Sequence, residues 1–342
     1  MTDKPEAATA ETRSKHAALG LEPERLVEMY RHMVLARAID RRMWVLNRQG
    51  RAPFWISGMG HEAIQVAVGM NMDKGKDWLA PYYRDLALTL VMGMTPMDHL
   101  LSVLAKAEDP NSGGRQMPAH YGSSAHNIIS TSSPVATQLL HAAGIALAMK
   151  MRGEDAICVT TVGEGSTSCG DFHEALNFAA THKLAVVFVV ENNGYAISVP
   201  VEKQMATPNV SDRALAYGIP GVSVDGNDVI ACYRSARDAV QRARSGGGPT
   251  LLEAKLHRLT SHSSDDDQRR YRSAEDLESE RARDCLPRCR TLLEDLGVLA
   301  PGEADALRVE LVAELDEATA YAEQAADPLA DTALLHVYAE EG

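Results

Sequence analysis

Two continuous apolar segments in the second half of the chain constrain its fold most. Residues 156–162 read AICVTTV and residues 184–190 read LAVVFVV, while residues 172–181 between them have the pattern of a helix. A strand that is apolar at every position is buried on both faces, which is typical of a parallel sheet covered by helices. We therefore predict a β–α–β unit within a doubly wound α/β fold.

The rest of the chain extends this alternation. Further helices are predicted at residues 21–48, 86–91, 97–105, 135–151 and 228–245, and further strands at 222–224 and 250–256. Residues 109–129 are expected to form a long irregular loop, a feature that is often functional in compact domains. From residue 273 the sequence becomes charged and helical, with an amphipathic helix at 302–325.

These patterns predict three parts of the chain. Residues 1–20 are polar and Ala-rich and are expected to be a disordered tail. Residues 21–272 are expected to form the α/β domain. Residues 273–342 are expected to form a helical segment that packs on this domain or on a partner subunit.

Composition excludes several classes of function. The net charge of −13 (34 basic minus 47 acidic side chains) disfavours non-specific nucleic-acid binding, which needs a basic surface. No apolar stretch reaches the roughly 20 residues of a membrane-spanning helix. The first 20 residues lack the apolar core of a signal peptide. With five scattered cysteines and no CxxC, we expect reduced thiols and a cytoplasmic protein.

Small polar residues follow both apolar segments directly. Gly163-Glu164-Gly165 follows the first and Asn192-Asn193 the second, and 193 − 163 = 30 positions is the length of one strand–helix–strand unit. Both motifs should therefore meet at the carboxyl edge of the sheet, where open α/β folds bind ligands. Carboxylate and amide oxygens suit Mg²⁺, and glycines let phosphate oxygens approach the backbone. Either motif alone is more often a tight turn, but together they predict a metal-bound diphosphate.

Other motifs argue against competing chemistries. No GxxxxGK[ST] occurs, and the GxGxxG pattern that begins at Gly163 is incomplete because Ser168 takes the place of its last glycine. His61-Glu62 resembles the start of a zinc-protease HExxH motif, but the second histidine is replaced by Gln65. The acidic run 265–267 lacks the spacing of a calcium-binding EF-hand.

At this point a family resemblance becomes clear. Residues 163–198 resemble the GDG…NN thiamine-diphosphate motif of the E1 α subunits of 2-oxoacid dehydrogenases, with Glu164 in place of the usual Asp. The resemblance extends over about residues 25–335 and includes PYYRD (81–85), GRQMP (114–118), SSPVATQ (132–138), YGIPGVSVDGND (217–228) and HSSDDDQRRYR (262–272). GRQMP and the last segment look more like the branched-chain enzymes than the pyruvate or acetoin enzymes.

The resemblance implies thiamine diphosphate and Mg²⁺ as cofactors, with Glu164, Asn193 and the Tyr195 carbonyl as Mg²⁺ ligands. The implied cofactor-binding residues are Tyr82, Tyr83, Arg84, Ser133, Val135, Gly163, Glu164, Gly165, Ser166, Asn193, Tyr195, Ile197 and His262. A further K⁺ site, present in some members, matches Ser132, Pro134, Thr137 and Gln138. His262 matches a catalytic histidine on a mobile loop, and its polar neighbours favour an exposed position. We predict that Arg258 and His262 are the catalytic residues. Arg258, Asp266, Tyr271 and Arg272 match residues that order this loop.

The implied activity is oxidative decarboxylation of 2-oxoacids, followed by acyl transfer to lipoyl groups of the E2 core. The implied partner is an E1 β subunit in an α₂β₂ heterotetramer, because this chain has room for only one cofactor-binding domain. An E1 α subunit for pyruvate or acetoin is the nearest alternative. A non-enzymatic nucleotide-binding scaffold is the alternative from another class of function.

Overall fold

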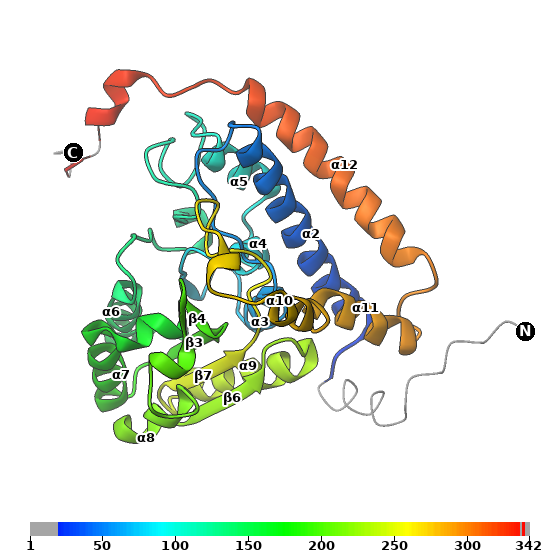
Figure 1. Cartoon of the computed structure of the whole chain (residues 1–342). Coiled ribbons are helices and arrows are strands. Elements are labelled where there is room, and N and C mark those ends of the chain that lie inside the picture. Colours follow the sequence, from blue (N-terminus) through cyan, green and yellow to red (C-terminus); the bar gives the residue numbers. More distant parts are fainter. Residues whose placement is uncertain (1–19, 336, 339–342) are drawn as a thin grey trace, which may run out of the picture.

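A parallel sheet forms the centre of the molecule (Figure 1). The computed structural model describes residues 20–335 and 337–338, so the predicted tail lies outside the described residues except for Gly20. The sheet has the order β1-β2-β3-β7-β6, and every neighbouring pair is parallel. Its strands are β1 (Trp78–Ala80), β2 (Cys158–Gly163), β3 (Val186–Asn192), β6 (Gly221–Asp225) and β7 (Thr250–Lys255). The predicted α/β class with a parallel sheet is confirmed.

Helices pack on both sides of this sheet. The helices of the described residues are α2 (Pro23–Arg48), α3 (Glu62–Gly69), α4 (Leu86–Met92), α5 (Pro96–Val103), α6 (Thr137–Arg152), α7 (Gly170–His182), α8 (Ala214–Tyr217), α9 (Val229–Arg244), α10 (Ala274–Arg281), α11 (Cys285–Asp295) and α12 (Glu303–Gln324). Side chains alternate along β3: Val187 and Val189 pack in the core that includes α3 and α9, whereas Val186 and Phe188 pack with α6 and α7. A short antiparallel pair, β4 (Tyr195–Ala196) and β5 (Val199–Pro200), follows β3.

The C-terminal helices pack against the start of the chain. In Figure 1, α12 lies beside α2, and ion pairs from Arg31 to Glu310 and from Arg42 to Asp316 join them, while Arg51, just after α2, pairs with Glu323. Since residue numbers rise in the same direction in each pair, the two helices run parallel. Leu311 and Leu315 of α12 are buried against this core, so the long N-terminal helix is covered by the C-terminal segment.

The elements that were not predicted from the sequence include helix α3 and strand β1. Helix α3 is buried at all eight of its positions, so it has no polar face and no amphipathic period to detect. Strand β1 has only three residues. The predicted loop at 109–129 is largely irregular and contains one 3₁₀ turn at Ser124–His126. Within the described residues, no helix combines the length and apolarity needed to cross a bilayer.

Candidate active site

The carboxyl ends of β2 and β3 bring the two polar motifs together. The strand register pairs Gly163 with Glu191, so the residues that follow each strand are neighbours. One Glu164 carboxylate oxygen accepts a hydrogen bond from the Asn193 backbone N–H at 3.2 Å. The Asn193 side-chain oxygen in turn accepts from the Tyr195 N–H at 3.2 Å. The three residues predicted to bind Mg²⁺ are therefore neighbours at the sheet edge.

Glu164 is a buried carboxylate that lacks a cationic partner. Glu164 is only 2% exposed, and no Lys, Arg or His of the described chain forms an ion pair with it within 4 Å. Burial raises its pKa, against the opposing effect of hydrogen bonds that include one from Gln204. The Gln204 side-chain oxygen beside it is itself buried and unpartnered. This environment fits a divalent cation, which would supply the missing positive charge.

A cavity of about 410 Å³ opens beside these residues. Eleven of the predicted cofactor-binding residues line it: Tyr82, Tyr83, Arg84, Ser133, Val135, Gly165, Ser166, Asn193, Tyr195, Ile197 and His262. Gly163 and Glu164 lie behind it at the strand end. Gly165 is required by close packing, because a Cβ atom there would stand 2.6 Å from the Ala196 Cβ.

The sequence reasoning missed part of this lining. Phe54, Ile56, Met117 and Ala196 add apolar surface, and His120 adds a second imidazole. Met117 lies within the GRQMP segment, which contributes to the family resemblance but gives no sign that Met117 lines the cavity. His120 is held by the Ser133 hydroxyl at 2.8 Å from its Nε2, and its Nδ1 faces the Met117 carbonyl at 3.2 Å. The spacing of the sequence carries no signal for these contacts.

His262 lies in the cavity wall and is held by Arg84. The Arg84 Nη2 donates to the His262 Nδ1 at 2.9 Å and to its carbonyl at 3.1 Å. Burial, followed by the charges of Arg84 and Arg258, lowers the pKa of His262 to about 3. The imidazole is therefore neutral at pH 7 with its proton on Nε2, where it can act as a hydrogen-bond donor. Our expectation of an exposed loop is wrong for Ser263, which is only 7% exposed.

Arg258 does not line the cavity, although it was grouped with His262 as catalytic. It is fully buried, and its Nη2 donates to the Ile197 carbonyl at 3.0 Å and to the Tyr271 hydroxyl at 2.8 Å. Tyr271 donates onward to Asp266, which accepts from the His262 backbone N–H at 2.8 Å. Arg258 thus braces the loop from beneath. Arg272 contributes likewise, through a bond of 2.9 Å to the Arg258 carbonyl.

The residues of the predicted K⁺ site lie close together beside the same cavity. Ser132, Pro134 and Gln138 border a small space of about 10 Å³ next to Tyr82 and Tyr83. Gln138 already donates to the Thr161 carbonyl at 2.8 Å, and Thr137 donates to the Pro134 carbonyl at 3.2 Å. K⁺ binding at this position stays a prediction.

A larger groove of about 850 Å³ lies beyond the ends of β6 and β7, against α11. It is bordered by charged side chains that include Asp225, Lys255 and Arg288, and Arg288 is neutralised by ion pairs to Asp225 and Asp228. None of the residues predicted to bind the cofactor lines it. Within the described chain, no group of three His, Cys, Asp or Glu side chains could hold a metal ion by itself.

Known proteins resemble this chain over most of its length. The 2-oxoisovalerate dehydrogenase subunit alpha of Bacillus subtilis is 50% identical over 96% of this chain and 99% of its own length. The 3-methyl-2-oxobutanoate dehydrogenase subunit alpha of Mycobacterium tuberculosis is 42% identical over 81% of this chain and 73% of its own. The pyruvate dehydrogenase E1 component subunit alpha of Staphylococcus aureus is 39% identical over 81% and 72%. Because the family model "Dehydrogenase E1 component" also matches residues 30–330, this chain belongs to that family.

Proposed function

We propose that this chain is the α subunit of a branched-chain 2-oxoacid dehydrogenase E1, acting in oxidative decarboxylation and acyl transfer to lipoyl groups of an E2 partner. The observation that carries the proposal is the unpaired, buried Glu164 beside Asn193, at the strand ends and next to a cavity with apolar walls. The 50% identity over nearly the whole chain to a 2-oxoisovalerate dehydrogenase subunit favours the branched-chain substrate over pyruvate.

The cofactor would be thiamine diphosphate with Mg²⁺, bound on a doubly wound sheet. Glu164 and Asn193 would hold the metal with the Tyr195 carbonyl. Because residue 165 has no side chain, its backbone N–H would be open to the diphosphate oxygens. When bound, thiamine diphosphate supplies the electron sink for decarboxylation. Arg84 holds His262 through its Nδ1, which leaves the Nε2–H of this cavity-lining residue as its hydrogen-bond donor. His262 is then placed to hold or pass a proton during acyl transfer.

An apolar wall and rim support both the substrate class and the partner. Phe54, Ile56 and Met117 line the cavity and suit a branched aliphatic side chain. At its mouth Met117, Val135 and Ile197 are 48%, 42% and 56% exposed. Apolar residues gathered in this way mark an interaction site. We infer that an E1 β subunit covers them in an α₂β₂ assembly, completing the cofactor site, and that the assembly works in the cytoplasm.

The decisive experiment compares substrates on the assembled enzyme. With its β partner, the chain should turn over 2-oxoisovalerate with a higher kcat/KM than pyruvate, and the reverse order would assign it to the pyruvate enzymes. Clear turnover by the isolated chain would refute the need for the β subunit. A thermal shift with ATP or NAD in place of thiamine diphosphate and Mg²⁺ would favour the nucleotide-binding alternative.

A further inference from the structure

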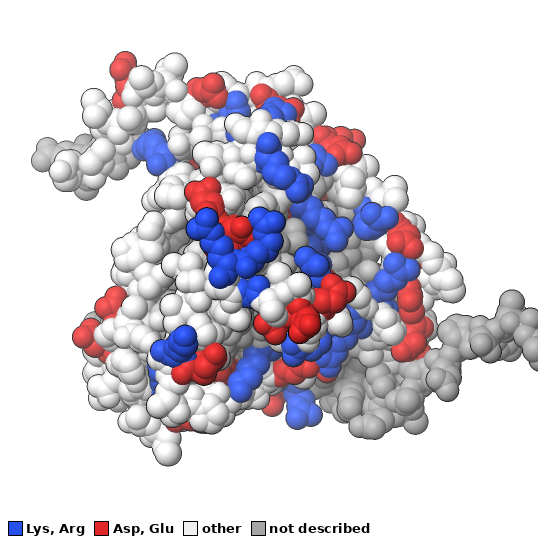
Figure 2. Space-filling view, in the orientation of Figure 1, with Lys and Arg blue, Asp and Glu red and all other residues white. Residues whose placement is uncertain are grey.

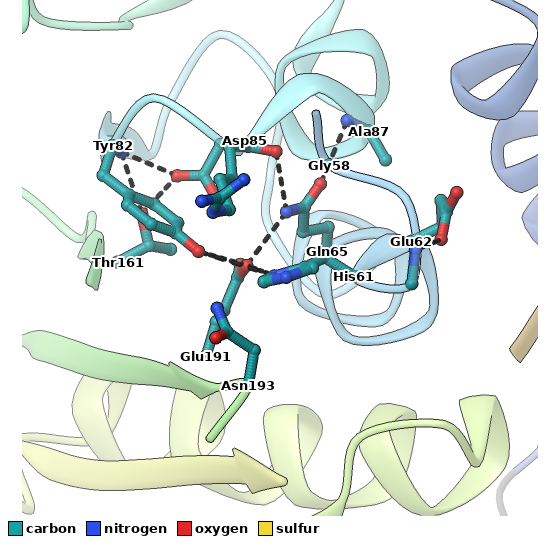
Figure 3. Close-up of polar contacts among 12 residues, drawn as sticks. Gly58, His61, Glu62, Gln65, Tyr82, Asp85, Ala87, Thr161, Glu191 and Asn193 are labelled. Carbon is teal, nitrogen blue, oxygen red and sulfur yellow. Dashed lines mark hydrogen bonds and ion pairs between the residues drawn. The ribbon is translucent and has the colours of Figure 1, made fainter. Parts of the chain in front are cut away.

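A buried polar cluster lies behind the cofactor cavity (Figure 3), and of its members only Tyr82 has been assigned a place in the cofactor site. Its centre is Glu191, which is fully buried and shares the face of β3 that carries Val187 and Val189 toward α3. Its only ion-pair partner within the described residues is the equally buried His61. Burying a carboxylate costs several kcal/mol unless its hydrogen bonds repay that cost, so the cluster calls for a functional explanation.

Three donors converge on one oxygen of Glu191. The His61 Nδ1 lies 2.6 Å away, the Tyr82 hydroxyl donates at 2.8 Å, and the Gln65 Nε2 donates at 3.0 Å. Figure 3 shows these side chains pointing toward the carboxylate from the start of α3 and from the loop after β1. His61 and Gln65 are four residues apart, so one helical face presents both. The HExxQ segment, which lacks the second histidine of a zinc motif, therefore binds the Glu191 carboxylate through His61 and Gln65.

Glu62 of the same segment points elsewhere. Its carboxylate pairs with Arg37 and accepts from the Gly60 backbone N–H at 2.8 Å, and it is as buried as Glu191. In Figure 3 it lies on the far side of α3 from Glu191. One short helix thus uses two buried carboxylates for separate contacts.

The cluster also grips the backbone of the loop that lines the cavity. The Gln65 Nε2 donates to the Arg84 carbonyl at 3.0 Å, and its side-chain oxygen accepts from the Ala87 N–H at 3.1 Å. At the other end of this segment, the Tyr82 hydroxyl donates to Glu191 at 2.8 Å. Residues 82–87, which comprise the loop 82–85 and the start of α4, are therefore held at both ends by contacts with Glu191 and Gln65.

We propose that Glu191 is a positioning residue that, through Tyr82 and Gln65, holds the loop at residues 82–87 in its cofactor-binding shape. Tyr82, Tyr83 and Arg84 of this loop face the cavity, and Arg84 carries the hydrogen bond to His262. Glu191 itself does not line the cavity. The effect on cofactor binding rests on the proposed function, whereas the effect on the loop does not.

The test uses two variants and one matched control. Glu191→Gln removes the charge at nearly constant volume, and Tyr82→Phe removes only the hydroxyl that reaches Glu191 and keeps the ring in the cavity wall. Glu62→Gln is the control, because it alters a similarly buried carboxylate, on helix α3 beside His61, that makes none of these contacts. Hydrogen exchange of residues 82–87 is measured in the full chain without cofactor. Thiamine diphosphate affinity is measured by calorimetry on the assembly with the β partner and Mg²⁺.

Loss of one hydrogen bond to a charged group should speed exchange in the loop and weaken cofactor binding by about tenfold in both test variants. The kcat at saturating cofactor should change far less than the cofactor concentration needed for half-maximal rate. The control should leave exchange at 82–87 unchanged. Unchanged loop exchange and cofactor affinity in both test variants would overturn the positioning role. Faster exchange in a protein whose wild type binds no thiamine diphosphate would support the positioning role and overturn the proposed function instead.

Discussion

Replacing Glu164 with Gln should stabilise the cofactor-free protein while removing its response to the cofactor. The carboxylate is only 2% exposed and accepts two long hydrogen bonds, of 3.2 and 3.4 Å. The burial that raises its pKa also makes its charge costly in the absence of a cation. Removing an unpaired buried charge gains several kcal/mol, and the amide gives up about 1 kcal/mol for each hydrogen bond it cannot keep. We expect a net gain of about 1–2 kcal/mol in the free energy of unfolding.

Ligand should reverse this order. At a concentration one hundred times the Kd, Mg²⁺ and thiamine diphosphate would stabilise the wild type by about 2.7 kcal/mol. Glu164→Gln lacks the carboxylate ligand and should keep less than about 1 kcal/mol of that gain, which corresponds to more than a tenfold loss of affinity. Urea denaturation at pH 7.5, with and without Mg²⁺ and thiamine diphosphate, measures both quantities.

Glu253→Gln provides the matched control. Glu253 is also a buried glutamate, on strand β7, which β3 separates from β2, but its two oxygens accept from the Asn192 side chain at 2.8 Å and from the Ser211 N–H at 3.0 Å. Its amide variant should lose about 1–3 kcal/mol and retain the ligand response. If Glu164→Gln behaves in the same way as this control, Glu164 is a structural acceptor and the metal assignment fails.

Three further predictions concern other parts of the molecule. Gly165→Ala should lower the free energy of unfolding by about 1–3 kcal/mol, because its Cβ would overlap Ala196. Gly144→Ala in helix α6 should raise it by up to about 1 kcal/mol, because no atom lies within 4 Å of the new Cβ. Equal effects of the two substitutions in urea denaturation would refute the packing argument. His262→Ala should leave thiamine diphosphate binding within about threefold but abolish reductive acylation of a lipoyl domain, and normal acylation in stopped-flow assays would contradict the role of its imidazole. Burial lowers the pKa of His99 to about 4, below its unfolded value, so the unfolded state binds the proton first. The free energy of unfolding of the wild type should therefore fall by about 3 kcal/mol as the pH falls from 6.5 to 4. His99→Gln should show a flatter dependence of this free energy on pH, and parallel profiles would contradict the assignment.

Sequence patterns located the elements in which buried positions recur regularly along the chain. The apolar segments became β2 and β3, and the stripe of leucines near the C-terminus became α12. Helix α3 could not be found in this way, because its burial on every side depends on α2, α4, α9 and the sheet rather than on its own periodicity. The charge pattern around His262 suggested an exposed loop, but Arg84 and Arg258 draw much of that loop inward.

The sequence alone predicts that residues 164 and 193 lie close together, because parallel strands separated by one helix end at the same edge of the sheet. It also determined the family, through several short motifs in a fixed order. The hydrogen-bond partners of the buried groups could be seen only in the folded chain. His61 and Gln65 bond to Glu191, and Arg84 donates to His262. The physical reason is range, since strand ends follow from local periodicity, whereas partners 126 residues apart are chosen by packing of the whole chain.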